Sequence, residues 1–301
     1  MKYKVINDQL IIEIDKTTQG QTILEYFHSM HLSKKTIHLL RQNKEYLYNH
    51  QFVDYNQVLK KGDLLQIKTF EKGIDFECFD HPLDIVYEDE FLLVINKEPG
   101  MIIHPEGKQG QHTLVNVVAN YYKKTNQNYP VRFIHRLDRD TSGLIMFCKC
   151  TLLQPLLDYQ IANKTIKKGY YALIEGHLQR KEMTVNQGIA RDRHHNQKMI
   201  VSKQGKTACT HFKEIKSNKQ ISLVSAFLET GRKHQIRVHL ASLNHPILSD
   251  PLYGKPYPKM PRLALHAYYL RFFHPLTNQV ITLQTKTPPD FCLQSEPISQ
   301  H

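Results

Sequence analysis

Short apolar runs rich in β-branched and aromatic residues recur along the chain and predict β-strands. They occupy residues 91–95, 144–148, 170–174, 221–228 and 280–284. Between the first two runs, Leu114, Val117, Val118 and Tyr121 follow the i, i+3, i+4, i+7 spacing of a helix that turns one face to a core. Strands interrupted by few helices, without strict alternation, favour an α+β fold on a mostly antiparallel mixed sheet.

The first 70 residues have a pattern of their own, which predicts a small α/β domain. We expect a strand over the segment LIIEI, helices over residues 22–30 and 34–42, and strands over 46–53 and 64–68. Residues 71–81 suit a linker, residues 82–291 form the larger domain, and residues 292–301 suit a flexible tail. Because the two domains have separate apolar patterns, the sequence predicts that each has its own core.

An excess of positive charge limits the partners that the chain can bind. The 40 Lys and Arg residues outnumber the 28 Asp and Glu residues, which gives a formal net charge of +12. Phosphate contacts release condensed counterions, so this balance favours a nucleic acid. An anionic membrane is the weaker alternative, because no apolar run approaches the roughly 20 residues that span a bilayer. The first residues lack the features of a secretory signal, so we expect a cytoplasmic protein, and we expect a monomer.

The cysteines and histidines do not follow a metal-binding pattern. Five cysteines are scattered without a CxxC pair, and the 18 histidines include no HExxH motif. The sequence therefore predicts neither a disulfide framework nor a metal site.

Two basic segments are candidates for phosphate contacts. The second expected helix has an apolar face that contains Ile37 and Leu40. The basic candidates are Lys34, Lys35 and Arg41, largely on another face of this helix, and Lys198, Lys203 and Lys206 in the lysine-rich stretch 191–219. The last three lie far in the sequence from the motifs described next, so we expect them to position RNA rather than to take part in chemistry. An ordinary solvated surface is the alternative.

Charged groups are densest in the segment RFIHRLDRDTSGLIMFC, residues 132–148. Arg136, Asp138, Arg139 and Asp140 precede a Thr-Ser-Gly turn, after which an apolar strand begins. An arginine close to an aspartate favours the charged carboxylate, which suits a nucleophile or a base. A surface ion-pair turn is the alternative that these residue types alone leave open.

Three motifs occur in the order typical of one enzyme family, the RluA-type pseudouridine synthases. The string HRLDRDTSG resembles the central motif of that family, and the resemblance implies that Asp138 is the catalytic residue. The string KKGYYALIEG resembles the second motif and implies that Tyr170 lies against the target base. The string HQIR resembles the third motif and implies that Arg237 pairs with the catalytic aspartate. The resemblance covers roughly residues 82–291 and implies the catalytic fold of that family.

Other residues gain roles from the same resemblance. Arg136 is placed to enter the space that the base vacates, and Leu265 would form an aliphatic floor under the base. Arg232 at a turn suits a phosphate contact. Residues 1–70 resemble the small RNA-binding module named after ribosomal protein S-four. The family usually has Gly-Asp-Pro where this chain has Ser-Asp-Pro at residues 249–251, and we expect this departure to affect loop geometry rather than chemistry.

The resemblance implies that the chain converts specific uridines to pseudouridine in structured RNA and needs no cofactor. The N-terminal module favours large-subunit ribosomal RNA as the substrate, with tRNA as the alternative. A non-catalytic RNA-binding or ribosome-assembly protein is one rival, although binding alone requires none of Asp138, Tyr170 and Arg237. A metal-dependent nuclease that uses Asp138, Asp140 and histidines as ligands is another. The RNA, the uridine positions and the chemical route at Asp138 stay open.

Overall fold

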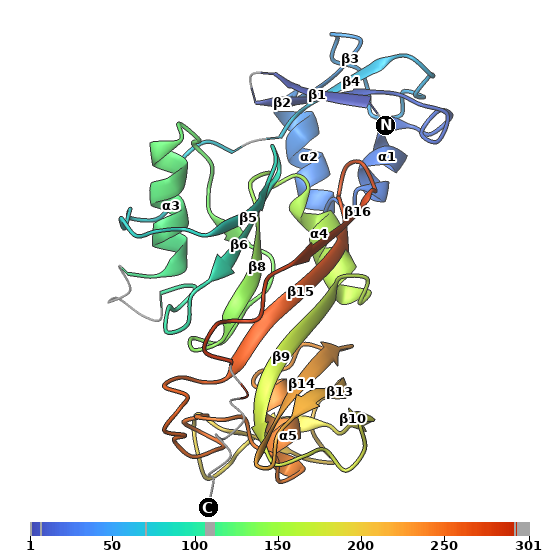
Figure 1. The fold of residues 1–301 in the computed structure, drawn as a ribbon. Helices are drawn as coiled ribbons and strands as arrows, with labels where there is room; N and C mark the ends of the chain where they lie inside the picture. The colour runs from blue at the N-terminus through green and yellow to red at the C-terminus, as the bar shows by residue number, and fades with distance from the viewer. Residues whose placement is uncertain (1, 7, 70, 106–111, 292, 294–301) are drawn as a thin grey trace, which may run out of the picture.

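A small N-terminal sheet and a long central sheet organise the computed structural model, which describes residues 2–6, 8–69, 71–105, 112–291 and 293 (Figure 1). The small sheet has the strand order β1-β2-β4-β3. Helix α1 begins after Thr22, whose side chain forms a capping box with Glu25, and α2 begins after the N-cap residue Ser33. The elements of this domain are β1 (Lys2–Ile6), β2 (Gln9–Glu13), α1 (Ile23–Ser29), α2 (Lys34–Gln42), β3 (Tyr46–Tyr48) and β4 (Leu64–Lys68).

The central sheet has the strand order β10-β13-β14-β9-β15-β8-β6-β5, with β16 beside β15 and β7 beside β8. Among the described pairings of this sheet, β15 with β8 is parallel and the others are antiparallel, so the predicted α+β fold on a mostly antiparallel mixed sheet is confirmed. Strands β11 and β12 of the same domain form a separate two-stranded sheet. The elements of this domain are β5 (Ile85–Glu88), β6 (Leu92–Lys97), α3 (Leu114–Lys124), β7 (Arg132–Phe133), β8 (Ser142–Cys148), α4 (Gln154–Ala162), β9 (Lys167–Glu175), β10 (Glu182–Asn186), β11 (Ile189–Arg191), β12 (Met199–Val201), β13 (Cys209–Ser217), β14 (Ile221–Leu228), α5 (Gln235–Ser242), β15 (Leu265–Phe273) and β16 (Val280–Gln284).

The parallel contact between β8 and β15 depends on Gly143. Its φ is +113°, and it pairs in register with Ala267. A Cβ atom at this position would lie 2.2 Å from the carbonyl oxygen of Ala267. A glycine is therefore required here if β15 is to pack against the turn that follows Asp138.

Several predicted elements have the bounds that the structure shows. The strands expected over 221–228 and 280–284 are β14 and β16. The strand expected over 46–53 is shorter, because β3 ends at Tyr48 and a turn follows. The sequence missed β1, an edge strand in which two lysines alternate with Tyr3 and Val5 and weaken the apolar signal.

The two domains do not have separate cores, so that prediction is wrong. One contiguous apolar cluster joins residues of the small domain, such as Leu10 and Phe27, to residues of β6 and β8. The rings of Tyr3 and Phe91 lie 5.5 Å apart across this boundary, and His31 stacks on Tyr159 of α4 at 3.7 Å. A second cluster, on the other face of the central sheet, packs against α3 and α5. Of the predicted tail 292–301, all but residue 293 lies outside the described residues.

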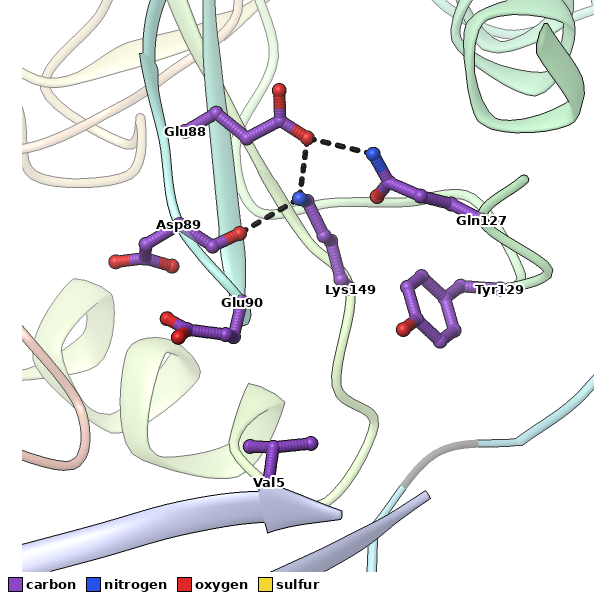
Figure 2. Close-up of a pocket in the computed structure, with 7 residues that line it drawn as sticks. All are labelled: Val5, Glu88, Asp89, Glu90, Gln127, Tyr129 and Lys149. Atoms are coloured by element: carbon purple, nitrogen blue, oxygen red, sulfur yellow. Dashed lines mark hydrogen bonds and ion pairs between the residues drawn. The ribbon is translucent and has the colours of Figure 1, made fainter. Parts of the chain in front are cut away.

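The space between the two domains includes an open cavity of about 580 Å³ (Figure 2). Lys149 points into it and is paired with Glu88, which also accepts a hydrogen bond from Gln127. None of the predicted catalytic residues lines this cavity. No helix in the described part of the chain combines the length and the apolar character that a membrane span requires.

Candidate active site

Segments far apart in the sequence bring Asp138 and Arg237 into direct contact. Asp138 precedes the turn into β8, and Arg237 lies in α5. The Nη1 atom of Arg237 donates a hydrogen bond of 3.0 Å to Oδ2 of Asp138. The backbone N–H of Thr141 donates to the carbonyl of Asp138 at 3.1 Å and closes the turn. The side chain of Asp138 keeps 30% of its surface exposed, so a ligand can reach this carboxylate.

Asp250 holds the other edge of the Arg237 guanidinium. Its two carboxylate oxygens accept hydrogen bonds of 2.7 Å from Nε and from Nη2. The Oδ1 atom also accepts from the backbone N–H groups of Leu252 and Tyr253. Both members of the pair are buried, so the guanidinium is fixed in position by a bidentate ion pair without any RNA.

The electrostatics of this array favour a permanently charged arginine. Burial acts to lower the pKa of Arg237, but the hydrogen bonds and negative charges of Asp250 and Asp138 outweigh burial and raise it above its usual value. The ring of Tyr253 covers the guanidinium at 5.2 Å. One cation therefore serves two carboxylates, and the array carries a net negative charge that extends to the exposed Asp138.

His234 lies at the entrance to α5 and beside the array. Its φ is +56°, and its Nδ1 atom shares a hydrogen bond of 2.9 Å with the hydroxyl of Tyr253. Its Nε2 atom is 3.8 Å from Oδ2 of Asp138. Burial lowers the pKa of His234 in spite of the nearby Asp138 carboxylate, so this imidazole is neutral near pH 7.

Lys97 ties the end of β6 to the segment that follows Asp138. Its ammonium donates hydrogen bonds to the carbonyl oxygens of Glu98, Met101 and Arg139. Burial lowers the pKa of Lys97 to about 8, although nearby carboxylates oppose the shift. The buried ammonium therefore fixes the backbone of Arg139, the residue directly after Asp138.

Tyr170 and Leu265 share one face of the sheet. Ala172 pairs with Leu265 and Tyr170 pairs with Ala267, so these side chains point to the same side. Burial raises the pKa of Tyr170, and the charge of Asp138 adds to the effect. Both effects favour the protonated phenol, which can stack or donate a hydrogen bond. Tyr171 points to the opposite face and stacks on Tyr268 at 3.7 Å.

The basic residues of the small domain are exposed on α2. Lys34 and Lys35 are open to solvent. Arg41 is also exposed, but it forms an ion pair of 3.1 Å with Asp54 and lies 4.4 Å from the centre of the Tyr55 ring. This arginine therefore already has intramolecular partners.

The basic residues of the large domain fall into two groups. Lys203 and Lys206 are exposed in the turn after β12. The ammonium of Lys198 instead lies 6.0 Å from the Tyr253 ring centre, beside the charge array. Lys198 is far in the sequence from the catalytic motifs, but the β11–β12 hairpin folds back onto Tyr253, whose hydroxyl accepts from the N–H of Met199.

The two remaining arginines predicted to contact RNA, Arg136 and Arg232, lie at the surface. Arg136 is exposed immediately before Leu137 and Asp138. Arg232 is exposed, and its Nε atom donates to the carbonyl of Thr207 at 3.0 Å. Both side chains therefore leave donors available to a ligand.

Sequence reasoning missed Asp250, Tyr253, His234 and Lys97. The departure at residues 249–251 is confined to Ser249, whose φ is +51° and whose hydroxyl donates to the carbonyl of Met260 at 2.5 Å. Asp250, which is common to both patterns, forms the bidentate pair with Arg237. The linear signals were the first residue of the string HQIR for His234 and, in the segment DPLYG, an aspartate and a tyrosine three residues apart.

Two regions of the chain match known protein families. Residues 91–242 match a family described as RNA pseudouridylate synthase, and residues 10–65 match the RluD ribosomal pseudouridine synthase N-terminal domain. The chain belongs to the RNA pseudouridylate synthase family. The predicted membership and the predicted enzyme class are thereby confirmed.

Relatives and solved structures extend the match over most of the synthase. The chain is 40% identical over 285 residues to the uncharacterized RNA pseudouridine synthase YhcT of Bacillus subtilis (strain 168), and the match covers 93% of this chain and 94% of the relative. It is 37% identical to ribosomal large subunit pseudouridine synthase D of Nitrosomonas europaea, covering 69% of this chain and 63% of the relative. The structure of human RNA pseudouridylate synthase domain containing 4 matches with a TM-score of 0.57 and 26% identity, covering 69% of this chain and 90% of that chain.

Proposed function

We propose that this synthase isomerises specific uridines of large-subunit ribosomal RNA in the cytoplasm, as a monomer, with Asp138 as the reacting carboxylate. The observation that carries the proposal is the position of Asp138, the exposed end of an otherwise buried array with Arg237 and Asp250. The choice of ribosomal RNA is supported by the match to the RluD N-terminal domain and by relatives named as large-subunit synthases.

The reaction asks little of the protein beyond positioning and charge. The bond between C1′ of the ribose and N1 of the base breaks, the base turns, and C1′ bonds to C5, while the proton at C5 leaves and N1 gains one. No oxidant, reductant or cofactor enters this balance. Because C1′ and C5 are inaccessible in a stacked helix, the nucleotide must be flipped out, at a cost of a few kcal/mol.

Each predicted side chain has a part in this scheme. Asp138 acts at the sugar or base while Arg237 keeps it ionised and oriented, because the guanidinium is already fixed by Asp250. Tyr170, a protonated phenol, packs on the flipped base, and Leu265 on the same sheet face lies beneath it. Arg136 fills the vacated place in the RNA.

Exposed cations would carry the phosphate contacts. Arg232, Lys203 and Lys206 belong to the catalytic domain, and Lys34, Lys35 and Arg41 belong to the small domain. Lys198 differs from these residues, because its ammonium lies 6.0 Å from the centre of the Tyr253 ring, which covers the Arg237 guanidinium.

The experiment is to map pseudouridine with a carbodiimide-based readout in cells that have or lack the gene. Sites that disappear with the gene should lie in large-subunit ribosomal RNA and return when the wild-type gene is restored. The Asp138→Asn variant should not restore them, whereas the matched control Asp140→Asn should. Loss of sites in tRNA alone would contradict the substrate, and restoration by Asp138→Asn would contradict the catalytic assignment.

A further inference from the structure

Three potential metal ligands of different types meet on the face of the sheet opposite to α5. Cys209 and His211 are two residues apart on β13, so their side chains share a face, while those of Thr210 and Phe212 are buried on the other. Glu229 directly follows β14, and its N–H donates to the carbonyl of Cys209 at 3.2 Å. The pairing of the two strands therefore brings Glu229 beside Cys209.

The ligand atoms of the three side chains are already close together. Cys209 Sγ, His211 Nε2 and a carboxylate oxygen of Glu229 all lie within 4.8 Å of one another. The distance from Nε2 to the Glu229 oxygen is 2.7 Å, and the distance from Sγ to Nε2 is 4.0 Å. Tetrahedral zinc, with bonds of about 2.0–2.3 Å, separates its ligand atoms by roughly 3.3–3.6 Å, so the distance from Nε2 to the Glu229 oxygen must lengthen and the distance from Sγ to Nε2 must shorten, each by less than about 1 Å.

A fourth residue orients the histidine. Nδ1 of His211 is 2.8 Å from the hydroxyl oxygen of Thr184 on β10, the residue paired with His211 in register. In the metal-free protein Nε2–H donates to the Glu229 carboxylate, which can only accept. Zinc would replace this proton, and the Thr184 hydroxyl would then accept from Nδ1–H while the Nε2 lone pair faces the metal. Histidines that bind metals almost always donate their other N–H in this way.

Charge and access also suit a divalent ion. A thiolate and a carboxylate together balance a dication, and neutral imidazole completes a donor set that zinc prefers. His211 and Glu229 are each about half exposed, which leaves room for a water as a fourth ligand. The Lys164 ammonium is 4.0 Å from Glu229, but its side chain is exposed and can turn away.

We propose that Cys209, His211 and Glu229 form a zinc-binding site, with Thr184 positioning His211 and water completing the coordination. The proposed zinc site lies on the face of the sheet opposite to α5 and shares no residue with the array of Asp138, Arg237 and Asp250. Gln235, at the start of α5, donates to the carbonyl of Cys209 at 3.0 Å, and Arg237 follows two residues later. Bound zinc would therefore stabilise the start of β13, to which the side chain of Gln235 in α5 is hydrogen-bonded.

The test is metal binding by the full-length protein after treatment with a chelator. Competition against a chromophoric chelator should give one zinc site of defined affinity, and Co²⁺ should give the near-ultraviolet charge-transfer band of a thiolate ligand. Cys209→Ser should abolish the cobalt band, and His211→Ala should weaken zinc binding at least tenfold. The controls Cys78→Ser and His38→Ala replace an exposed cysteine and an exposed histidine elsewhere and should change neither readout.

Thr184→Val tests the geometry without touching a ligand. It removes the hydroxyl that orients His211 and should weaken zinc binding about tenfold or more, with the cobalt band retained. Equal zinc affinity in wild type and Cys209→Ser would overturn the proposal. A wild-type protein without a thiolate–cobalt band would overturn it as well.

Discussion

Replacing Asp250 by Asn should reveal how strongly the array depends on this buried carboxylate. Asn can keep an oxygen toward Nη2 of Arg237 and toward the N–H groups of Leu252 and Tyr253, but its NH₂ group then faces Nε, a donor. Removing one partner of a buried ion pair costs about 3–5 kcal/mol. Because Asp138 remains beside the guanidinium, we expect the lower end, about 3 kcal/mol.

Thermal unfolding followed by circular dichroism measures this cost. Unfolding entropies of about 2 cal/mol/K per residue convert a loss of about 3 kcal/mol into a fall in Tm of about 5 °C for a chain of this length. A shift of the guanidinium by about 1 Å would also misplace Asp138 and reduce kcat by about 100-fold. KM for RNA should change little, since Asp250 is buried and does not face solvent.

The matched control is Asp54→Asn, which breaks an exposed ion pair with Arg41. Exposed pairs contribute about 0–1 kcal/mol, so its Tm should stay within about 2 °C of the wild type. If Asp250→Asn unfolded like the control and kept the wild-type kcat, then Asp250 would not position Arg237, and our description of the array would be incorrect.

Three further predictions concern RNA binding, pH and the domain boundary. Neutralising Lys203 and Lys206 together should make the slope of log affinity against log salt shallower by about 1.4, at about 0.7 for each phosphate of a single strand, with kcat unchanged; an unchanged slope would show that they do not contact phosphate. Burial lowers the pKa of His266 to about 4, so between pH 6.5 and 4 the unfolded chain binds a proton that the folded chain does not. As pH falls through this window, the wild type should therefore lose about 3 kcal/mol more stability than His266→Gln. An equal pH dependence of stability in the urea-unfolding curves of the two proteins would contradict this. Deleting residues 1–70 should expose Phe91 and Leu92 and cause aggregation at temperatures where the full chain is soluble, measured by light scattering; a soluble fragment with an unchanged Tm would show that the shared cluster is not needed.

The sequence predicted the elements that have a clear apolar period and missed those that do not. Strands β14 and β16 match their predicted bounds, because continuous or alternating apolar residues mark them. Strands β1 and β16 share the same alternation of exposed and half-buried residues, but the two lysines of β1 weaken its apolar signal, and pairing with β2 defines it. The core shared by the two domains could not be predicted from the sequence, because an apolar run indicates that a face is buried but not which domain covers it.

The same distinction applies to the site. Motif strings indicated Asp138, Tyr170 and Arg237, but the bond between Asp250 and Arg237 depends on where the segment after α5 returns. Lys198 reaches Tyr253 only because the β11–β12 hairpin folds back. Cys209 and Glu229 are twenty positions apart, so no spacing rule could join them before strand pairing was known.

The most direct test of the central claim is turnover by purified Asp138→Asn on RNA labelled with tritium at C5 of uridine. The substitution keeps the size of the side chain and removes its charge, and the partly exposed Asp138 should tolerate it with little loss of stability. We predict that tritium release is lost while the Kd for RNA stays within about twofold of the wild-type value. Release at the wild-type rate would contradict the assignment of Asp138 as the catalytic carboxylate.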